Sequence, residues 1–293
     1  MFRSMLFAPA NHARRVEKAF QLDADAVILD LEDAVAESEK AKARAQLRII
    51  LAAPRTKPAF VRVNGFPTPH FHEDLLAAAA AVADGIILPK VETRDQLVIA
   101  DWLVGEEEKK QGLKPGAILL IPHFETAAGI GKAVEILSAS SRVRWAGFGG
   151  GDFTADLNLD PSRNERELAP YRAALVLASR QVGIEPPLDS AWTDLNDLDG
   201  LREVAEASRR AGFQGKRCIH PDQIAIVNHV FTPSARDIEK AENVVAAFDQ
   251  AEASGNAAIR VGDAFVDYPV AARARRVLAI RDRLGASAGS DGE

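Results

Sequence analysis

The sequence alternates regularly between short β-rich runs and longer amphipathic segments, and this alternation constrains the fold more than any other feature. Each β-rich run leads into a polar or glycine-containing turn, and the apolar spacing of a helix follows. Alternation of this kind predicts a parallel sheet with right-handed crossovers. The eight predicted strands are Arg3–Pro9, Ala26–Leu31, Ala59–Asn64, Gly85–Val91, Ala117–Phe124, Val143–Phe148, Glu185–Asp189 and Lys216–His220.

Helical patterns lie between these strands. Gly183 and Gly212 follow the last two patterns, where a helix end favours a residue with positive φ. Eight strands with intervening helices predict a (β/α)8 TIM barrel with a C-terminal helical extension. A doubly wound sheet is the alternative, although six strands would suffice for it. The clearest helical patterns are Glu39–Ala52, Phe71–Ala83, Arg94–Val104, Ala127–Ser138, Arg163–Val182 and Asp197–Ala211.

Polar side chains recur at the carboxyl ends of the predicted strands. Barrel enzymes place their catalytic residues on this rim. One charged residue after a strand is unremarkable, because strands end in solvent, but recurrence at almost every strand favours a functional site. These rim residues are Glu32, Asp33, Arg62, Asn64, Lys90, Glu125, Asp152, Asp189 and His220.

The composition is that of a globular protein with a sizeable core. The 293 residues suit one large domain or two medium ones, and 47% are hydrophobic while 27% are charged. A formal net charge of −6 argues against a nucleic-acid partner. The single cysteine, Cys218, excludes an internal disulfide. Without a signal-like start or a run near the ~20 apolar residues of a membrane span, we expect a cytoplasmic protein with no membrane partner.

The predicted barrel domain covers residues 1–232, and a segment that a barrel does not need follows it. Helical, strand-like and basic helical patterns succeed one another at Pro233–Gln250, Ala258–Val261 and Val270–Leu284. Ser234 is a plausible N-cap for the first. We expect residues 233–286 to form a lid that packs on a neighbouring subunit, with a simple packing lid as the alternative. Residues 287–293 are small, polar and acidic, which predicts a disordered tail.

Glu125 and Asp152 are candidate metal ligands. Glu125 ends the fifth predicted strand and Asp152 lies beyond the sixth, and consecutive strand ends in a barrel lie side by side. Two carboxylates, with other positions left for water and substrate, suit Mg²⁺. The alternative is that both are acids stabilised by the dipoles of the helices that follow them. Spacing alone does not decide between these interpretations.

The segment WAGFGGGDFTADL, residues 145–157, has a glycine cluster that resembles a phosphate-binding loop. Its cluster ends on Asp152, where a dinucleotide-binding pattern requires its last glycine, and an acid there would repel a phosphate. We therefore expect Gly149, Gly150 and Gly151 to serve the aspartate, by letting the backbone leave the sixth strand sharply and by leaving open space around the metal and substrate.

Arg62 emerges from an otherwise apolar run, where an unpaired arginine would be costly to bury. It either pairs with Glu32 or Asp33 of the second strand, or binds a substrate carboxylate or enolate oxygen. The second interpretation is favoured because the carboxylates outnumber the arginine. Glu32 and Asp33 are adjacent and point in different directions if the strand persists, so one can orient Arg62 or reach the water shell of a metal. Lys90 is expected in a salt bridge rather than as a Schiff-base amine.

The other reactive side chains do not form a recognisable site. Cys218 and His220 are two apart on a strand, without a nucleophile elbow, so Cys–His catalysis is not expected. The remaining histidines lack the spacing of metal ligands. Arg14, Arg15 and Lys18 form a basic cluster after the first strand, which is either a solvated face or a binding place for phosphates.

Together these segments resemble the citrate lyase β-subunit-like family of the HpcH/HpaI aldolase group. The resemblance covers nearly the whole chain, through RSMLFAPA, DAVILDLEDAV, VRVN, DGIILPKVE, FETAAG, GGGDFTADL, GKRCIHPDQ and FTPSA. It implies a TIM barrel that binds Mg²⁺ and makes or breaks a carbon–carbon bond in a 3-hydroxyacyl-CoA, such as citryl-, malyl- or citramalyl-CoA. The products of cleavage are a 2-oxo acid and an acyl-CoA, and members assemble as homotrimers or hexamers.

The resemblance also implies roles for individual residues. The family's metal ligands, which also contact substrate, correspond to Glu125 and Asp152. Its oxo-acid-binding arginine corresponds to Arg62, and the acidic pair of its second strand corresponds to Glu32 and Asp33.

In malyl-CoA lyase-like members, an aspartate of the C-terminal extension reaches the adjacent subunit's site as general acid. Asp267 resembles that residue, and Asp263 is the nearby alternative. The basic residues Arg14, Arg15 and Lys18 suit the phosphates of CoA. The chain departs from the family in the loop PANHAR, residues 9–14, which lacks a glycine, and in His123 and Phe124, which replace smaller aliphatic residues near the acyl pocket.

Three hypotheses for function follow. The first is a Mg²⁺-dependent lyase acting on an acyl-CoA, or on a thioester of an acyl-carrier partner subunit. The second is a class II aldolase that cleaves free 4-hydroxy-2-oxo acids. The third is a non-catalytic protein that binds CoA or an oxo acid. Asp267, Arg14 and Arg15 favour the first hypothesis.

Overall fold

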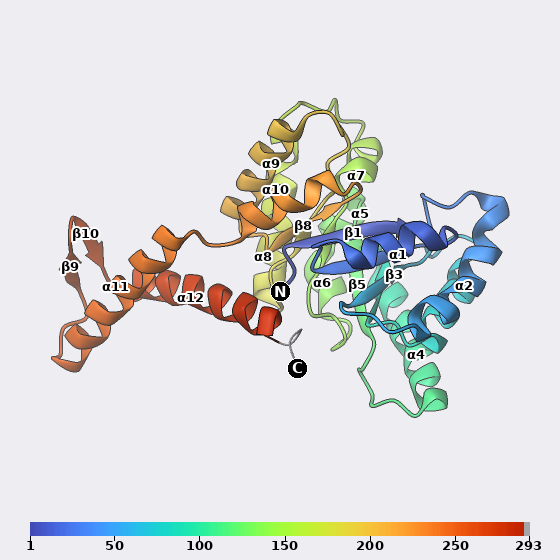
Figure 1. Ribbon diagram of the computed structural model, residues 1–293, viewed down its shortest axis with the longest axis horizontal. Coiled ribbons are helices and arrows are strands. Elements are labelled where there is room, and N and C mark those ends of the chain that lie inside the picture. Colours follow the sequence, from blue (N-terminus) through green and yellow to red (C-terminus); the bar gives the residue numbers. More distant parts are fainter. Residues whose placement is uncertain (290–293) are drawn as a thin grey trace. The chain divides into compact units, whose positions relative to one another are not determined.

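Eight parallel strands close into one barrel in sequence order, and helices surround it (Figure 1). The computed structural model describes residues 1–289, with side chains as far as residue 285. The barrel confirms the predicted (β/α)8 fold, and all strands except β8 lie within their predicted runs. The strands are β1 (Ser4–Pro9), β2 (Ala26–Asp30), β3 (Ala59–Arg62), β4 (Gly85–Leu88), β5 (Leu119–Phe124), β6 (Gly147–Phe148), β7 (Leu188–Asp189) and β8 (Gly215–Cys218).

The crossovers are helical, with two short 3₁₀ turns, η1 (Glu37–Glu39) and η2 (Arg166–Leu168). Gly183 and Gly212 have φ of 75° and 107°, as expected for residues at helix ends. The helices of this unit are α1 (Ala13–Gln21), α2 (Lys40–Ala52), α3 (Phe71–Ala80), α4 (Arg94–Gln111), α5 (Ala127–Gly131), α6 (Ala133–Leu137), α7 (Gly150–Asp156), α8 (Ala169–Gln181), α9 (Leu198–Ala211) and α10 (Asp222–Phe231).

Several crossovers differ from the helical patterns of the sequence, and α4, for example, continues to Gln111, beyond the expected Val104. The single helix expected over Ala127–Ser138 is two helices, because Lys132 leaves the helical region with φ −117° and ψ 17°. The helix expected from Arg163 begins as α8 only at Ala169, after a left-handed Glu165 with φ 48°. The glycine cluster after β6 is the start of a helix, α7, which its glycines make hard to recognise because glycine has low helix propensity.

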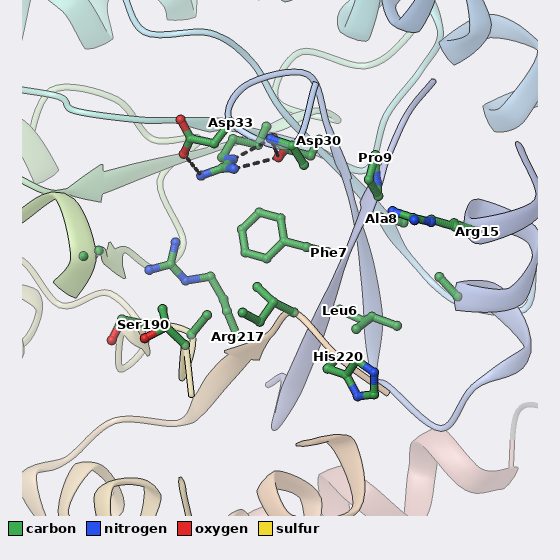
Figure 2. A pocket seen from close by; sticks show the side chains of 18 of the residues that line it. Leu6, Phe7, Ala8, Pro9, Arg15, Asp30, Asp33, Ser190, Arg217 and His220 are labelled. Carbon is green, nitrogen blue, oxygen red and sulfur yellow. Dashed lines mark hydrogen bonds and ion pairs between the residues drawn. The ribbon is translucent and has the colours of Figure 1, made fainter. Parts of the chain in front are cut away.

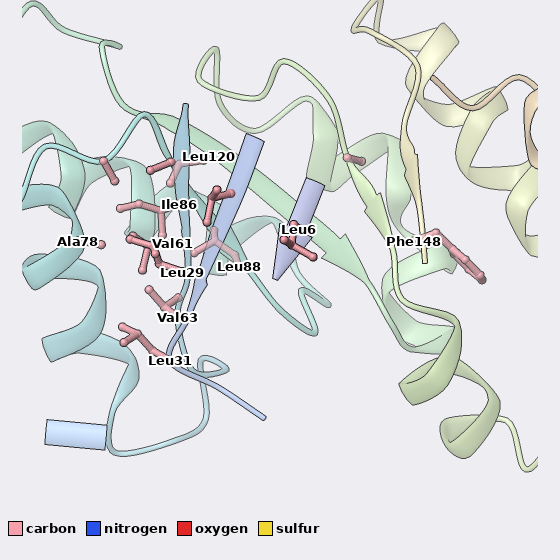
Figure 3. Close-up of a cluster of buried hydrophobic side chains, with 14 of the residues drawn as sticks. Leu6, Leu29, Leu31, Val61, Val63, Ala78, Ile86, Leu88, Leu120 and Phe148 are labelled. Atoms are coloured by element: carbon pink, nitrogen blue, oxygen red, sulfur yellow. The ribbon is translucent and has the colours of Figure 1, made fainter. Parts of the chain in front are cut away.

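The barrel interior is apolar at one end and charged at the other. Inward residues early in the strands form one cluster: Met5, Ala26, Ile28, Phe60, Ile87, Ile121, Trp145 and Leu188. Two residues further along, the inward positions of β2 and β3 carry Asp30 and Arg62, and that of β5 carries His123. A larger cluster, which includes Leu29, Val61 and other outward residues, fills the space between the strands and the helices (Figure 3).

Residues from Thr232 onward form a second compact unit with its own core. It contains α11 (Ala235–Ala253), a hairpin of β9 (Ile259–Val261) and β10 (Ala264–Val266), and α12 (Tyr268–Gly289). Its core includes Val244, Phe248, Val266 and Ala271. Ser234 caps α11 as predicted, since its Oγ accepts the N–H of Asp237 and that side chain returns the bond.

The last helix continues beyond the predicted start of the disordered tail. α12 includes residues 287–289, so these three are helical, while residues 290–293 of the expected tail lie outside the described residues. Among residues 1–289, no helix is both long enough and apolar enough to cross a membrane.

Candidate active site

A cavity of about 800 Å³ lies at the carboxyl end of the barrel (Figure 2). Residues that follow most of the strands line it, as expected for the catalytic rim of a barrel. Of the rim residues and the basic cluster singled out from the sequence, those that are not part of its lining are Glu32, Asn64, Lys90, Asp189 and Arg14. Those that line it are Arg15, Lys18, Asp33, Arg62, Glu125, Asp152 and His220.

Arg62 is surrounded by acidic side chains. Its Nε and Nη2 each donate to Asp30 at 2.7 Å, and its Nη1 lies 3.0 Å from Glu32 and 3.2 Å from Asp33. The guanidinium also stacks over the ring of Phe7 at 4.6 Å. Arg62 therefore pairs with Glu32 and Asp33, but its principal partner is Asp30, which was not among the residues singled out from the sequence.

Asp30 also shapes the loop that carries the acidic pair. Besides Arg62, its carboxylate accepts the backbone N–H groups of Glu32 and Ala34, both at 3.0 Å. The buried Lys40 donates to the carbonyls of Leu31 and Glu32 at 3.0 Å. The chain therefore turns sharply after β2 and places Glu32 and Asp33 on two sides of the Arg62 guanidinium.

Glu32 is buried outside the cavity lining and bridges two cations. Its carboxylate lies 2.9 Å from Nζ of Lys90 and 3.0 Å from Nη1 of Arg62. Burial raises the pKa of Glu32 to about 7, and the nearby Arg62 only partly offsets this, while Glu125 and Asp33 raise it further. Glu32 can therefore exchange a proton near neutral pH.

Lys90 contacts three of the acidic residues of the rim. Its Nζ lies 2.9 Å from Glu32 and 3.2 Å from Asp152, and its backbone N–H donates to Oε2 of Glu125 at 3.2 Å. Its φ of 51° is uncommon for a residue other than glycine. Burial lowers the pKa of Lys90, but the hydrogen bond and charge of Glu32 outweigh this and raise it. The predicted salt bridge is confirmed, and a raised pKa is the opposite of what a Schiff-base amine requires.

Glu125 directly follows β5 and is almost fully buried, with 2% of its side chain exposed. Its Oε1 lies 3.4 Å from Nδ1 of His123. Burial alone would raise the pKa of Glu125, but His123, Arg217 and Arg62 lower it to about 2. Glu125 is therefore a carboxylate at any physiological pH.

The glycine cluster makes room for the neighbours of Asp152. A Cβ on Gly149 would lie 2.3 Å from Cγ of Glu125, and one on Gly147 would lie 2.3 Å from the His123 ring. Asp152 itself lies in the first turn of α7, and 41% of its side chain is exposed. Our expectation that the glycines serve mainly Asp152 is therefore corrected, because the close approaches involve Glu125 and His123.

The donor set at this rim fits a hard divalent cation. Glu125 and Asp152 both line the cavity and offer carboxylate oxygens, and a cation, the ammonium of Lys90, already lies against Asp152. Within the described residues, no group of three or more His, Cys, Asp or Glu side chains is placed to hold a metal. A metal held by these two carboxylates would keep positions for water and substrate. Asp152 is also an acid in the first turn of a helix, so that interpretation remains compatible with its position.

Arg217 is a cavity residue that the sequence reasoning missed. It lies on β8, is 4% exposed, and contacts His123 of β5, with 2.7 Å between Nη1 and Nδ1. Burial and the charge of Arg217 lower the pKa of His123 to about 3. The alternation of side chains along a strand could have indicated it. Cys218 points outward, into the core between the strands and the helices, so its neighbour Arg217 points into the barrel.

The remaining candidates have other local contacts. Cys218 is buried, which raises its pKa to about 12, and His220 is exposed beside Asp222, so they form no catalytic pair. In the C-terminal unit, Asp267 precedes α12 and accepts the N–H of Val270 at 3.2 Å. Asp263 lies at the hairpin turn, 2.9 Å from Arg260.

We expect replacement of Glu32 by glutamine to stabilise the protein above neutral pH. The pKa of Glu32 is about 7 in the fold against an ordinary 4.5. Between these values folding takes up a proton, so this residue's contribution to stability falls as pH rises. We expect urea unfolding to show that the free energy of unfolding of Glu32→Gln, relative to that of the wild type, is higher at about pH 8 than at about pH 5. A difference that is constant with pH, or of opposite sign, would contradict the assignment.

Gly149→Ala should destabilise the barrel, because the new Cβ would overlap the buried side chain of Glu125. Overpacking of this kind costs about 1–3 kcal/mol, which urea unfolding can measure. Gly151→Ala is the matched control, since nothing lies within 4 Å of a Cβ at that position. Equal stability of the two variants would show that Glu125 is not held against Gly149.

Comparison with known proteins places the chain in a family. The HpcH/HpaI aldolase/citrate lyase family matches residues 3–221. The citrate lyase subunit beta of Leuconostoc mesenteroides subsp. cremoris is 35% identical, covering 94% of this chain and 92% of that protein. A (3S)-malyl-CoA thioesterase of Cereibacter sphaeroides is 37% identical, covering 97% and 96%.

Solved structures agree with this placement. The protein CitE from Mycobacterium tuberculosis, in complex with magnesium, acetoacetate and coenzyme A, has a TM-score of 0.77 and 31% identity, covering 94% of this chain and 97% of that one. RipC from Yersinia pestis has a TM-score of 0.68 and 31% identity, covering 81% and 98%. The chain therefore belongs to the HpcH/HpaI aldolase/citrate lyase family, as a lyase-type enzyme related to citrate lyase β subunits.

Proposed function

We propose that this protein is a Mg²⁺-dependent carbon–carbon lyase that cleaves or forms a 3-hydroxyacyl-CoA, with a 2-oxo acid and an acyl-CoA as the other reactants. The observation that carries the proposal is that Glu125, Asp152 and Arg62 line the same cavity. The CitE structure with magnesium, acetoacetate and coenzyme A supports it, since that relative is similar over nearly the whole chain.

Glu125 and Asp152 would hold the metal. A bound Mg²⁺ supplies Lewis acidity, which lowers the pKa of a substrate hydroxyl and favours its alkoxide. The pKa of about 2 at Glu125 keeps this ligand ionised, as metal binding requires.

The proposed cleavage is a retro-Claisen reaction. The substrate hydroxyl loses its proton to water in the cavity, and its C–O bond becomes the carbonyl of the oxo acid. The adjacent carbon–carbon bond breaks, and its electron pair passes to the thioester as an enolate. Nη1 of Arg62 stabilises the oxyanion charge, a contribution of about 3–4 kcal/mol for a well-placed donor. Protonation of the enolate carbon then gives the acyl-CoA.

The acidic pair has two different roles in this proposal. Asp33 lines the cavity and is 60% exposed, so it can contact ligand or water directly. Glu32 is outside the lining and bridges Arg62 and Lys90, so we assign it the orientation of these two cations.

We assign the carbon-protonating acid to Asp267 of a neighbouring subunit. This assignment makes residues 233–286 a lid shared within a homotrimer or hexamer. It rests on the resemblance to malyl-CoA lyase-like proteins. Asp263 is the less favoured alternative, because its carboxylate pairs with Arg260 in the hairpin turn.

The cavity wall formed by α1 suits a carrier with phosphate groups. Arg15 and Lys18 line the cavity and are exposed, whereas Arg14 on the same helix is not part of the lining. We therefore propose that Arg15 and Lys18 contact CoA, and that an acyl-carrier partner subunit is the less favoured source of the thioester. The likeness to a (3S)-malyl-CoA thioesterase supports a second candidate activity, hydrolysis of the thioester after cleavage.

Incubation of the purified protein and Mg²⁺ with citryl-, malyl- and citramalyl-CoA, followed by mass spectrometry, tests the function. We expect an oxo acid and an acyl-CoA from at least one substrate, and free CoA where hydrolysis follows. Asp152→Ala should abolish both Mg²⁺ binding and turnover while leaving the fold intact, because Asp152 lies on the rim and is half-exposed. Full turnover in Asp152→Ala would rule out the metal assignment, and cleavage restricted to free 4-hydroxy-2-oxo acids would favour the aldolase.

Mixed oligomers test whether sites are shared. Asp267→Asn and Asp152→Ala should each be inactive alone, because one lacks the acid and the other the metal ligand. After dissociation and random reassembly in equal amounts, about a quarter of the shared sites would combine an intact barrel with an intact lid. Activity near that fraction of wild type is expected, and no recovery in verified mixed oligomers would contradict sharing.

A further inference from the structure

Arg217 is a buried cation without an acidic partner. Its Nη1 lies 2.7 Å from His123, its Nε donates to the backbone carbonyl of Asp189 at 3.3 Å, and its Nη2 donates to the carbonyl of Phe148. In the part of the chain that the structure describes, no carboxylate lies within 4.0 Å of its guanidinium. Imidazole and carbonyl groups carry no negative charge, so these contacts do not neutralise Arg217.

Other buried arginines of the barrel are neutralised within the fold. Arg62 contacts three carboxylates, Arg142 contacts Glu108 and Asp101, and Arg172 contacts Asp189 and Glu165. Burying an unpaired charge costs several kcal/mol. Burial of Arg217 therefore costs free energy that the paired arginines Arg62, Arg142 and Arg172 do not cost.

Nearby acids are already engaged. The carboxylate of Asp189 is taken by Arg172, Lys216 and Ser208, so only its carbonyl reaches Arg217. Glu125 acts on Arg217 only at longer range and accepts the backbone N–H of Lys90. Within the described residues the charge of Arg217 is offset only at longer range, chiefly by Glu125, so a carboxylate in direct contact with its guanidinium would have to come from the cavity.

Arg217 faces the same cavity as the acidic rim but from another side. Arg217, Asp30 and Asp33 all line the cavity of about 800 Å³. Figure 2 shows Arg217 on the other side of the Phe7 ring from Asp30 and Asp33. A guanidinium has five N–H donors in a planar fork that matches a carboxylate. Two cationic groups therefore face one cavity: Arg62, surrounded by acids, and Arg217, which lacks them.

We infer that Arg217, supported by His123, binds a second carboxylate of the substrate. This inference rests on the proposed lyase function, in which one carboxylate and the hydroxyl lie at the metal site beside Arg62. The substrate is then a 3-hydroxyacyl thioester with two free carboxylates, and the 2-oxo acid that it releases is a dicarboxylate. Arg217 is thus the specificity-determining residue for this second charge.

Equilibrium binding of two four-carbon 2-oxo acids tests the inference. Oxaloacetate and 2-oxobutanoate share the 2-oxo acid group, and only the first has a distal carboxylate. Calorimetric titration of fresh solutions in the presence of Mg²⁺ should show at least about tenfold tighter binding of oxaloacetate, since a charge-assisted bidentate bond is among the stronger polar contacts. Arg217→Gln should abolish this preference by weakening oxaloacetate alone, and Arg217→Lys should keep part of it.

The outcomes separate this inference from the proposed function. Mg²⁺ titration without oxo acid, and thermal unfolding, serve as controls for each variant. Equal affinities of the wild type for both acids would overturn the inference whatever the variants do, while leaving the lyase proposal standing. Loss of Mg²⁺ binding and of both acids in folded Arg217→Gln would also overturn it, because Arg217 would then act by holding Glu125. A wild type that binds neither Mg²⁺ nor 2-oxobutanoate would instead count against the lyase function itself.

Discussion

The buried ion pair between Asp30 and Arg62 organises the carboxyl end of the barrel. Asp30 accepts two guanidinium N–H groups from β3 and two backbone N–H groups from the loop after β2. Removing one partner of such a pair typically costs about 3–5 kcal/mol, because the other charge stays buried. Arg62 in turn contacts Glu32 and Asp33, and Glu32 contacts Lys90, so the charged groups of the rim depend on this pair for their positions.

The sequence was sufficient for the barrel and for part of the cavity wall. Strand–helix alternation is a local pattern, and in a barrel it also sets which strands are neighbours. Glu125 and Asp152 therefore line one cavity, as expected from their places after β5 and near the start of α7. Ser234, Gly183 and Gly212 were likewise predictable, because capping depends on residues close in the chain.

Contacts between distant strands could not be read in the same way. Asp30 belongs to an apolar run and Arg217 to a short polar one, and neither shows its partner in its own neighbourhood. The reason for the glycines was not readable from the sequence either, because Gly147 makes room for His123 of β5 and Gly149 makes room for Glu125, which follows β5. The role proposed for Asp267, and the lid proposed for residues 233–286, would involve a second chain, which one sequence does not describe.

The exposed basic residues of α1 have a consequence for the speed of binding. The whole chain has a formal charge of −6, so a polyanionic ligand meets a weakly repulsive field at a distance. Arg15 and Lys18 reverse that field locally at one wall of the cavity. Local attraction of this kind accelerates association and is screened over a Debye length of about 8 Å at physiological ionic strength. The capture rate of such a ligand is therefore governed by dissolved salt, whereas the buried charges below, at Arg62 and Arg217, are largely shielded from it.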